Sequence, residues 1–126
     1  MKTAVPIPFH ITDWSQISVT EHAGETGMAL WKTLQFGNLR VRQVEYTAGY
    51  LADHWCCKGH IIYCLEGEIV TELSDGSKYI LKQGMSYQVS DEESRHRSFS
   101  ATGTKLFIID GDFLQWQQPI TRGIWM

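Results

Sequence analysis

The segment from Glu68 to Leu81 reads Glu-Ile-Val-Thr-Glu-Leu-Ser-Asp-Gly-Ser-Lys-Tyr-Ile-Leu and predicts a β-hairpin. Two runs rich in β-branched and aromatic residues flank its central Ser74-Asp75-Gly76-Ser77. An Asp-Gly pair favours a tight turn because these residues tolerate the positive φ angles that such turns require. The fold prediction therefore extends outward from two antiparallel strands.

Further runs of strand length lie on both sides of the hairpin, separated by glycines. They cover Leu39 to Tyr46, Ile61 to Leu65, Met85 to Val89, Arg97 to Ser100 and Lys105 to Asp110. No long window has the apolar spacing of a surface helix, and the best helical candidate is the short Thr12 to Ile17. The sequence predicts an all-β, jelly-roll-like barrel as a single domain over residues 1–126, with a barrel core at about 30–111, an N-terminal arm and a short C-terminal tail.

The composition is typical of one compact domain and excludes several classes of partner. The length of 126 residues fits a single core. A formal charge of −3 provides no basic surface for phosphates, so we expect no nucleic-acid partner. The longest apolar runs are far shorter than the roughly 20 residues that span a bilayer, and the first residues show no secretory signal. We therefore expect a cytoplasmic protein without membrane contact, and its three cysteines, two of them adjacent, fit reduced thiols better than disulfides.

Four side chains in the strand-rich middle form a candidate metal site. His54 and Cys56 are two residues apart and would share a face of an extended segment. A bend after Cys56 would bring His60 beside them, and His96 would complete the set from a distant hairpin. Imidazoles with one thiolate suit a borderline-soft ion, so we expect one divalent transition metal per subunit, either zinc, iron, nickel or copper. Cys56 has an alternative role as a small buried apolar residue.

The spacing of these residues resembles the first metal motif of the cupin family. That motif reads Gly, His-x-His, three or four residues, Glu, six residues, Gly. The sequence has Gly49, His54-x-Cys56, three residues, His60, six residues and Gly67, so Cys56 replaces the second His and His60 replaces the Glu. A looser second motif runs from Gly84 to His96, one residue longer than the common spacing and without its Pro and Gly.

The run Ala52-Asp53-His54-Trp55-Cys56-Cys57-Lys58-Gly59-His60 also resembles a small uncharacterised group, the DHCW-motif cupin fold proteins. The same group is similar across Thr12-Asp13-Trp14, Gly24-Glu25-Thr26-Gly27 and Gly84-Met85-Ser86-Tyr87-Gln88-Val89. The resemblance implies a cupin barrel, metal-bound and often dimeric. It names no substrate.

Four further residues are candidates for lining a pocket: Cys64, Arg42, Tyr87 and Ser98. Cys64 has the spacing to face the barrel interior, although it is more typical of core, and we also expect Cys57 in the core, facing away from Cys56. An inward Arg42 would hold a carboxylate ligand, but Arg40 and Arg42 together are more typical of an exposed strand face.

Other residues favour ordinary structural roles. We expect Asp53 to serve a turn and not to orient His54, because adjacent strand residues face opposite sides. The acidic run Asp91-Glu92-Glu93 is typical of a solvated loop. Aromatic residues near the termini, namely His10, Trp14, Trp116 and Trp125, favour a homodimer interface.

Three functions remain open at this stage. The first is a metal-dependent enzyme, such as a dioxygenase or isomerase, although no residue supports a specific reaction. The second is a non-catalytic sensor or binder of a small molecule, which four filled protein ligands would favour. The third is a metal-free structural dimer. We rank a metal-binding cupin of unassigned activity first.

Overall fold

The predicted hairpin is formed by β5 (His60–Leu73) and β6 (Lys78–Lys82) in the computed structural model, which describes residues 6–111. The two strands pair antiparallel from Glu68 opposite Lys82 to Glu72 opposite Lys78. Gly76 adopts a φ of 92°, and its N–H donates to the Leu73 carbonyl at 2.9 Å. The Asp-Gly turn prediction is therefore confirmed.

The described chain forms nine strands and one short 3-10 helix, and the all-β prediction is confirmed. The remaining elements are η1 (Trp14–Gln16), β1 (Thr20–Ala23), β2 (Met28–Phe36), β3 (Leu39–Tyr46), β4 (Tyr50–Leu51), β7 (Ser86–Val89), β8 (His96–Ser100) and β9 (Thr104–Asp110). The sequence analysis did not identify β1, β2 or β4. No helix in the described residues is long and apolar enough to cross a membrane.

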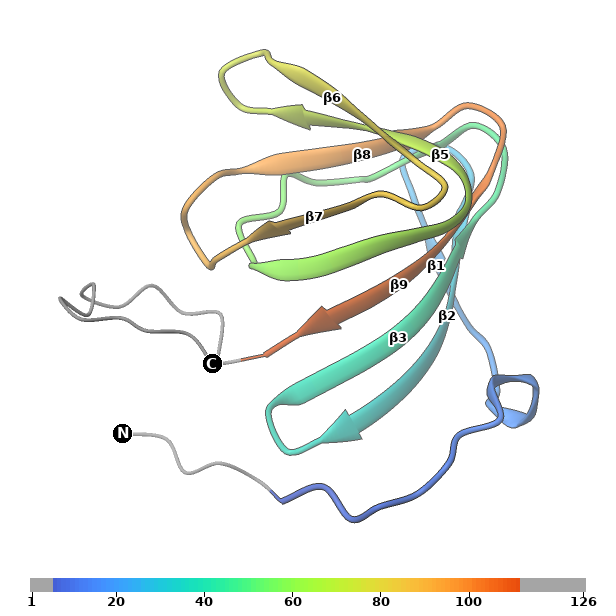
Figure 1. Ribbon diagram of the computed structural model, residues 1–126. Helices are drawn as coiled ribbons and strands as arrows, with labels where there is room; N and C mark the ends of the chain where they lie inside the picture. The colour runs from blue at the N-terminus through green and yellow to red at the C-terminus, as the bar shows by residue number, and fades with distance from the viewer. Residues whose placement is uncertain (1–5, 112–126) are drawn as a thin grey trace, which may run out of the picture.

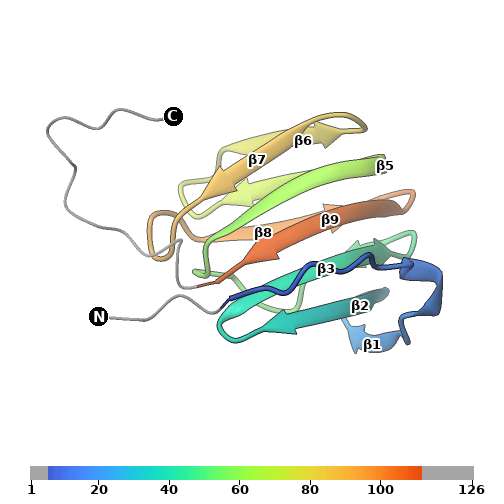
Figure 2. The same ribbon diagram turned by 60° about the horizontal axis from the view of Figure 1, so that its bottom comes forward.

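The strands curl into an open cup, with β2, β3 and β9 on one side and β6 and β8 on the other (Figure 1). One run of antiparallel pairs has the order β1-β2-β3-β9-β5-β7, and a second has the order β4-β8-β5-β6. Figure 2 shows the first run from below, with β5, β9, β3, β2 and β1 laid side by side. Strand β5 belongs to both runs and therefore joins the two sides of the cup.

Strand β5 changes its inward-facing residues midway. His60, Ile62 and Cys64 are buried in its first half, whereas Ile69 and Thr71 are buried in its second half. The pairing with β9 shifts register between Cys64 and Glu66, which is a β-bulge. Two strands were predicted here, Ile61 to Leu65 and the first strand of the hairpin, and the structure corrects this to one bent strand.

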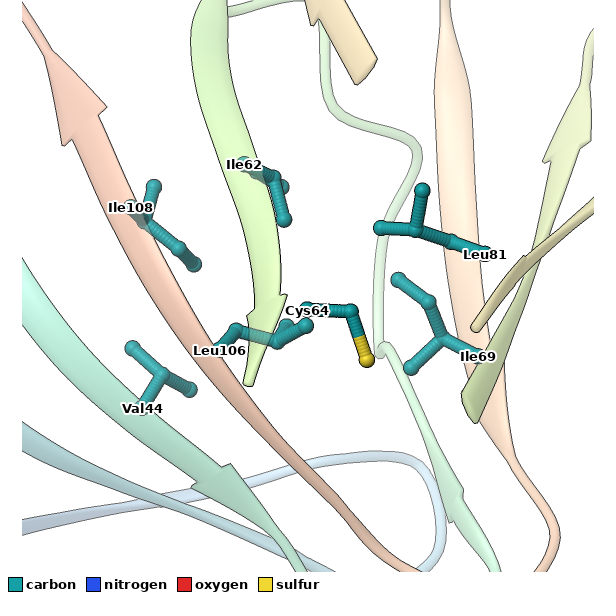
Figure 3. Packing of buried hydrophobic residues seen from close by; sticks show 7 residues of the cluster. All are labelled: Val44, Ile62, Cys64, Ile69, Leu81, Leu106 and Ile108. Atoms are coloured by element: carbon teal, nitrogen blue, oxygen red, sulfur yellow. The ribbon is translucent and has the colours of Figure 1, made fainter. Parts of the chain in front are cut away.

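The hydrophobic core lies between the two sides of the cup, on both sides of the bend in β5 (Figure 3). Its buried side chains come from β3, β5, β6 and β9: Val44, Ile62, Cys64, Ile69, Leu81, Leu106 and Ile108. Cys64 is fully buried among them, and its Sγ donates to the Gly67 carbonyl at 3.4 Å. Cys64 is therefore a core residue, which was its expected role.

The N-terminal arm contacts the outer surface of the same chain. Asp13 caps η1 by accepting a hydrogen bond from the Ser15 N–H at 3.0 Å, as expected for a helical start near this residue. The Trp14 ring packs edge-on against Phe107 of β9, with ring centroids 5.8 Å apart. Trp14 thus has a partner within its own chain. The predicted roles of Trp116 and Trp125, and the expected C-terminal tail, lie outside the described residues.

Candidate functional site

A cavity of about 790 Å³ opens at one end of the cup. The starts of β3, β5 and β8 and the end of β9 all lie at this end (Figure 1). Two loops, residues 52–59 before β5 and residues 90–95 before β8, carry further lining residues at the same end. The volume is typical of a site for a small molecule.

Two buried histidines face each other in this cavity. His60 begins β5 and His96 begins β8, and their Nε2 atoms are 2.8 Å apart. His96 Nδ1 donates to the carbonyl of Ser94 at 2.9 Å, so the neutral form of this ring has its lone pair on Nε2, the atom that faces His60. Burial, together with His96 and Arg42, lowers the pKa of His60 to about 3, so this ring is neutral at pH 7.

Cys56 is tied to the backbone of His96 by an isolated β-bridge. Its N–H donates to the His96 carbonyl at 2.8 Å, and the His96 N–H donates back at 3.0 Å. The thiol lies 3.8 Å from the carbonyl oxygen of Lys58, and burial raises the pKa of this thiol. Cys57 lines the same cavity, which corrects the expectation that it would lie in the core.

His54 lies at the exposed rim of the cavity, apart from the buried histidine pair. About 71% of its side chain is exposed, and its Nδ1 is 2.6 Å from Asp53 Oδ1. The carboxylate therefore does orient this imidazole, contrary to the expectation from strand geometry. That expectation was wrong because residues 52–59 form a loop, in which neighbouring side chains need not face opposite sides.

A cluster of three charged residues lies beside the histidines. Arg40 and Asp110 are directly opposite each other on β3 and β9, and Arg42 is two residues further along the same face. Asp110 accepts hydrogen bonds from Arg40 Nε at 3.0 Å, from Arg40 Nη2 at 2.9 Å and from Arg42 Nη2 at 3.0 Å. Arg42 is only 5% exposed, which corrects the expectation of an exposed arginine face.

Aromatic rings form much of the remaining wall. The guanidinium of Arg42 stacks on Trp31, with its Cζ 4.3 Å from the ring centroid. Tyr46 and Tyr50 stack on each other with centroids 4.2 Å apart, and Trp55 lies under Arg97. All of these aromatic residues line the cavity. The sequence analysis singled out none of the four for the site.

The predicted pocket residues divide into two groups. Arg42 and Ser98 line the cavity, whereas Cys64 is in the core and Tyr87 lies behind His60. The Tyr87 hydroxyl is 3.3 Å from His60 Nε2. Asp91, expected in a solvated loop, accepts a hydrogen bond from the Gly59 N–H at 2.6 Å and thereby ties the two loops together.

The four predicted metal ligands are not all brought together. Within residues 6–111, no group of three or more His, Cys, Asp or Glu side chains is arranged to hold a metal ion. His60 and His96 are adjacent, Cys56 lines the same cavity, and His54 is at the rim. A metal held by four protein ligands stays a prediction. The buried pair of His60 and His96 is the part of this predicted site whose side chains are in contact.

Comparison with known proteins identifies the fold. No protein-family model and no curated protein matches the chain. Among solved structures, an RmlC-like cupin from Shewanella frigidimarina is 19% identical with a TM-score of 0.68, covering 82% of this chain and 91% of that one. Ectoine synthase from P. lautus is also 19% identical, with a TM-score of 0.65 and coverage of 82% and 78%. The Fe(II) form of HppE with an alternative substrate is 14% identical, with a TM-score of 0.66 and coverage of 85% and 62%.

These likenesses establish that the described chain has the cupin fold, as the motif spacing predicted. At this level of sequence identity they carry the fold alone. The chemistry of the site has to be argued from its own residues.

Proposed function

We propose that this protein binds one divalent transition metal through His60 and His96 and binds a small molecule in the adjoining cavity. The observation that carries the proposal is the pair of buried Nε2 atoms 2.8 Å apart. One of these atoms has a lone pair fixed toward the other by the Ser94 carbonyl. At this distance a lone pair on one Nε2 atom is satisfied either by an N–H on the other Nε2 atom or by a metal ion held between the two nitrogens.

The geometry of the pair is close to what a metal requires. Two imidazole nitrogens at about 2.0–2.1 Å from zinc are roughly 3.0–3.4 Å apart, depending on the angle between the bonds. The observed 2.8 Å is smaller, so both rings would separate by less than about 1 Å. Without metal, a proton on His60 Nε2 donated to His96 satisfies the pair. After this small movement, the pair would supply two of the ligands of a metal ion.

A third ligand would come from the loop before β5. Cys56 is the better placed because its backbone is bonded to His96 and its side chain lines the cavity. His54 would require the loop to turn inward and its bond with Asp53 to break. Two imidazoles and a thiolate suit zinc, iron, nickel or copper better than magnesium or calcium.

A bound metal would supply Lewis acidity or redox chemistry at this point in the cavity. The chain's own residues would position the ligand: Arg42 offers a buried cation, Tyr46 and Tyr50 an aromatic surface, and Ser98 a hydroxyl. HppE, which shares the fold, is an Fe(II) protein by its name, and this supports a metal without identifying one here. We assign no reaction.

The metal content of the purified protein tests the proposal. Elemental analysis of untagged protein, purified without chelators, is expected to give nearly one zinc, iron, nickel or copper per chain. His60→Ala and His96→Ala should each reduce that content at least tenfold, whereas the exposed His10→Ala should not. Cys57→Ala is the matched control for Cys56→Ala, since both thiols line the cavity but only Cys56 is proposed to bind metal.

A folded protein that stays metal-free in all these preparations would contradict the metal part of the proposal. The cavity would then favour the second candidate, a metal-free binder of small molecules. The observation that supports this candidate is the His60–His96 hydrogen bond, which already satisfies the Nε2 atoms of both rings without a metal.

A further inference from the structure

The cluster of Arg40, Arg42 and Asp110 in the cavity wall carries an excess of positive charge. Arg40 and Arg42 share the single carboxylate of Asp110, so two positive charges meet one negative charge and one remains. One carboxylate ligand would neutralise the remaining positive charge.

Arg42 is the member of the cluster with a buried donor that has no partner among the described residues. Asp110 is bonded to both Arg40 Nε and Arg40 Nη2, so the Arg40 fork is filled. Arg42 reaches Asp110 only through Nη2, and its buried Nε has no hydrogen-bond partner among the described residues. Buried donors in folded proteins are usually bonded, and an unpaired one is costly. Since Arg42 lines the cavity, a ligand is a natural source of the acceptor.

The orientation of Arg42 favours a planar acceptor. Trp31 covers one face of the guanidinium at 4.3 Å, which fixes its plane, and the N–H donors lie in that plane along the edge of the group. A carboxylate can meet such an edge in the same plane with two oxygens. The stacked rings of Tyr46 and Tyr50 line the same cavity and would contact the apolar part of the ligand.

We propose that the cavity selects a small monocarboxylate with an apolar or aromatic body, and that Arg42 is the residue that recognises its carboxylate. This inference rests on the proposed small-molecule role of the cavity but does not require the metal. It names a ligand class for the site and a specificity-determining residue that the metal-binding proposal leaves open.

Matched probes test the carboxylate directly. Benzoate and benzamide have the same shape but differ in charge, and phenylphosphonate adds a second negative charge. We expect calorimetric titration of the whole protein to show benzoate binding at least about tenfold more tightly than benzamide, as charge-assisted hydrogen bonds predict. Phenylphosphonate should bind no better than benzoate, because only one positive charge of the Arg40, Arg42 and Asp110 cluster is unpaired. Equal affinities for benzoate and benzamide, or a clear preference for phenylphosphonate, would overturn the inference.

Arginine variants test the residue. Arg42→Gln should reduce the benzoate preference to within about twofold, while Arg42→Lys keeps the charge beside Asp110 and should retain part of it. Arg97→Gln is the matched control, because Arg97 also lines the cavity and stacks on a tryptophan, but two carboxylates, those of Glu25 and Glu72, lie within 4 Å of it and leave no excess positive charge. If Arg42→Gln does not fold, the Lys variant and the probe series on the native protein still decide the question. A benzoate preference that persists in folded Arg42→Gln would assign it to another residue and overturn the role of Arg42.

The titrations are repeated on metal-depleted and zinc-loaded protein, which separates this inference from the metal proposal. Benzoate selectivity in a protein that binds no metal would support the carboxylate site and contradict the metal site. Stoichiometric metal without benzoate selectivity would do the opposite.

Discussion

Asp110 is a buried carboxylate whose charge depends on two arginines. Burial by itself would raise its pKa, but the hydrogen bonds from Arg40 and the charges of Arg42 and Arg40 outweigh this effect. The pKa of Asp110 therefore lies below its usual range in the folded state. Such a group stabilises the fold above its unfolded pKa of about 3.9, and the stabilisation is lost as the pH falls through the folded pKa.

Asp110→Asn should therefore destabilise the protein at neutral pH and weaken the dependence of its free energy of unfolding on pH in the acid range. We expect the free energy of unfolding to fall by about 3 kcal/mol at pH 7, because two arginines lose their only described carboxylate partner. The difference from the native protein should shrink below about pH 4. Urea unfolding at pH 7 and pH 3 measures both effects. Glu45→Gln, on the outer face of β3, is the control and should change stability little.

An Asp110→Asn variant as stable as the native protein at pH 7 would contradict this reasoning. It would mean that the arginines are satisfied by water entering from the cavity.

The sequence could predict the histidine pair but not the charged cluster. The motif spacing placed His60 and His96 together, whereas Arg40 and Arg42 were assigned outward because charged side chains are usually exposed. Arg40 and Arg42 lie at the same alternate positions of β3 as Val44, which is in the core. This alternation could have predicted that both arginines face inward. The partner Asp110 lies 68 residues from Arg42, and no local pattern gives that pairing. The contact between Asp53 and His54 was not predicted, because a strand rule was applied to a loop.

At the scale of elements, the bend in β5 depends on one glycine. Gly67 follows the bulge with a φ of 79°, and a Cβ there would overlap the carbonyl oxygen of Gly103. Gly76 in the hairpin turn also has a positive φ, of 92°, but nothing lies within 4 Å of a Cβ at that position. An alanine at Gly76 therefore tests backbone strain alone, whereas an alanine at Gly67 tests backbone strain together with steric overlap.

Gly67→Ala should destabilise the protein more than Gly76→Ala. The turn variant carries only the left-handed backbone cost of about 1–2 kcal/mol. The bulge variant adds displacement of the backbone at Gly103, so we expect a total of about 3 kcal/mol or more. Chemical denaturation of both variants gives the comparison. Equal losses would show that the two backbones at the bulge can separate freely.

The same bulge explains why strand prediction was incomplete. Gly67 lies between two strand-like runs and was interpreted as a break between two strands, although glycine also marks bulges. Strand β2 was missed for a different reason, since most of its residues are half-buried and it lacks clear alternation. The Asp-Gly hairpin was predicted well because its turn is decided by neighbouring residues alone.

At the scale of the whole molecule, we predict a homodimer. The N-terminal arm exposes 92% of Phe9 and 86% of Ile11, and a second chain is the partner that would cover them. Sedimentation of the native protein should give twice the mass of one chain. Phe9→Ser combined with Ile11→Ser should shift the protein toward monomer, while Tyr79→Ser on exposed β6 should not. A native protein that sediments as a monomer at high concentration would contradict the prediction.

The loop of residues 52–59 is attached to the cup mainly through its backbone. Main-chain hydrogen bonds link Ala52 to Ser98, Cys56 to His96 and Cys57 to Glu92. None of these bonds depends on the identity of a loop side chain, yet His54, Cys56 and Cys57 line the cavity. Mutations in this loop can therefore change the donor atoms offered to a ligand while the barrel keeps its stability. Substitution of these three side chains is therefore a short route to a different ligand specificity on the same barrel.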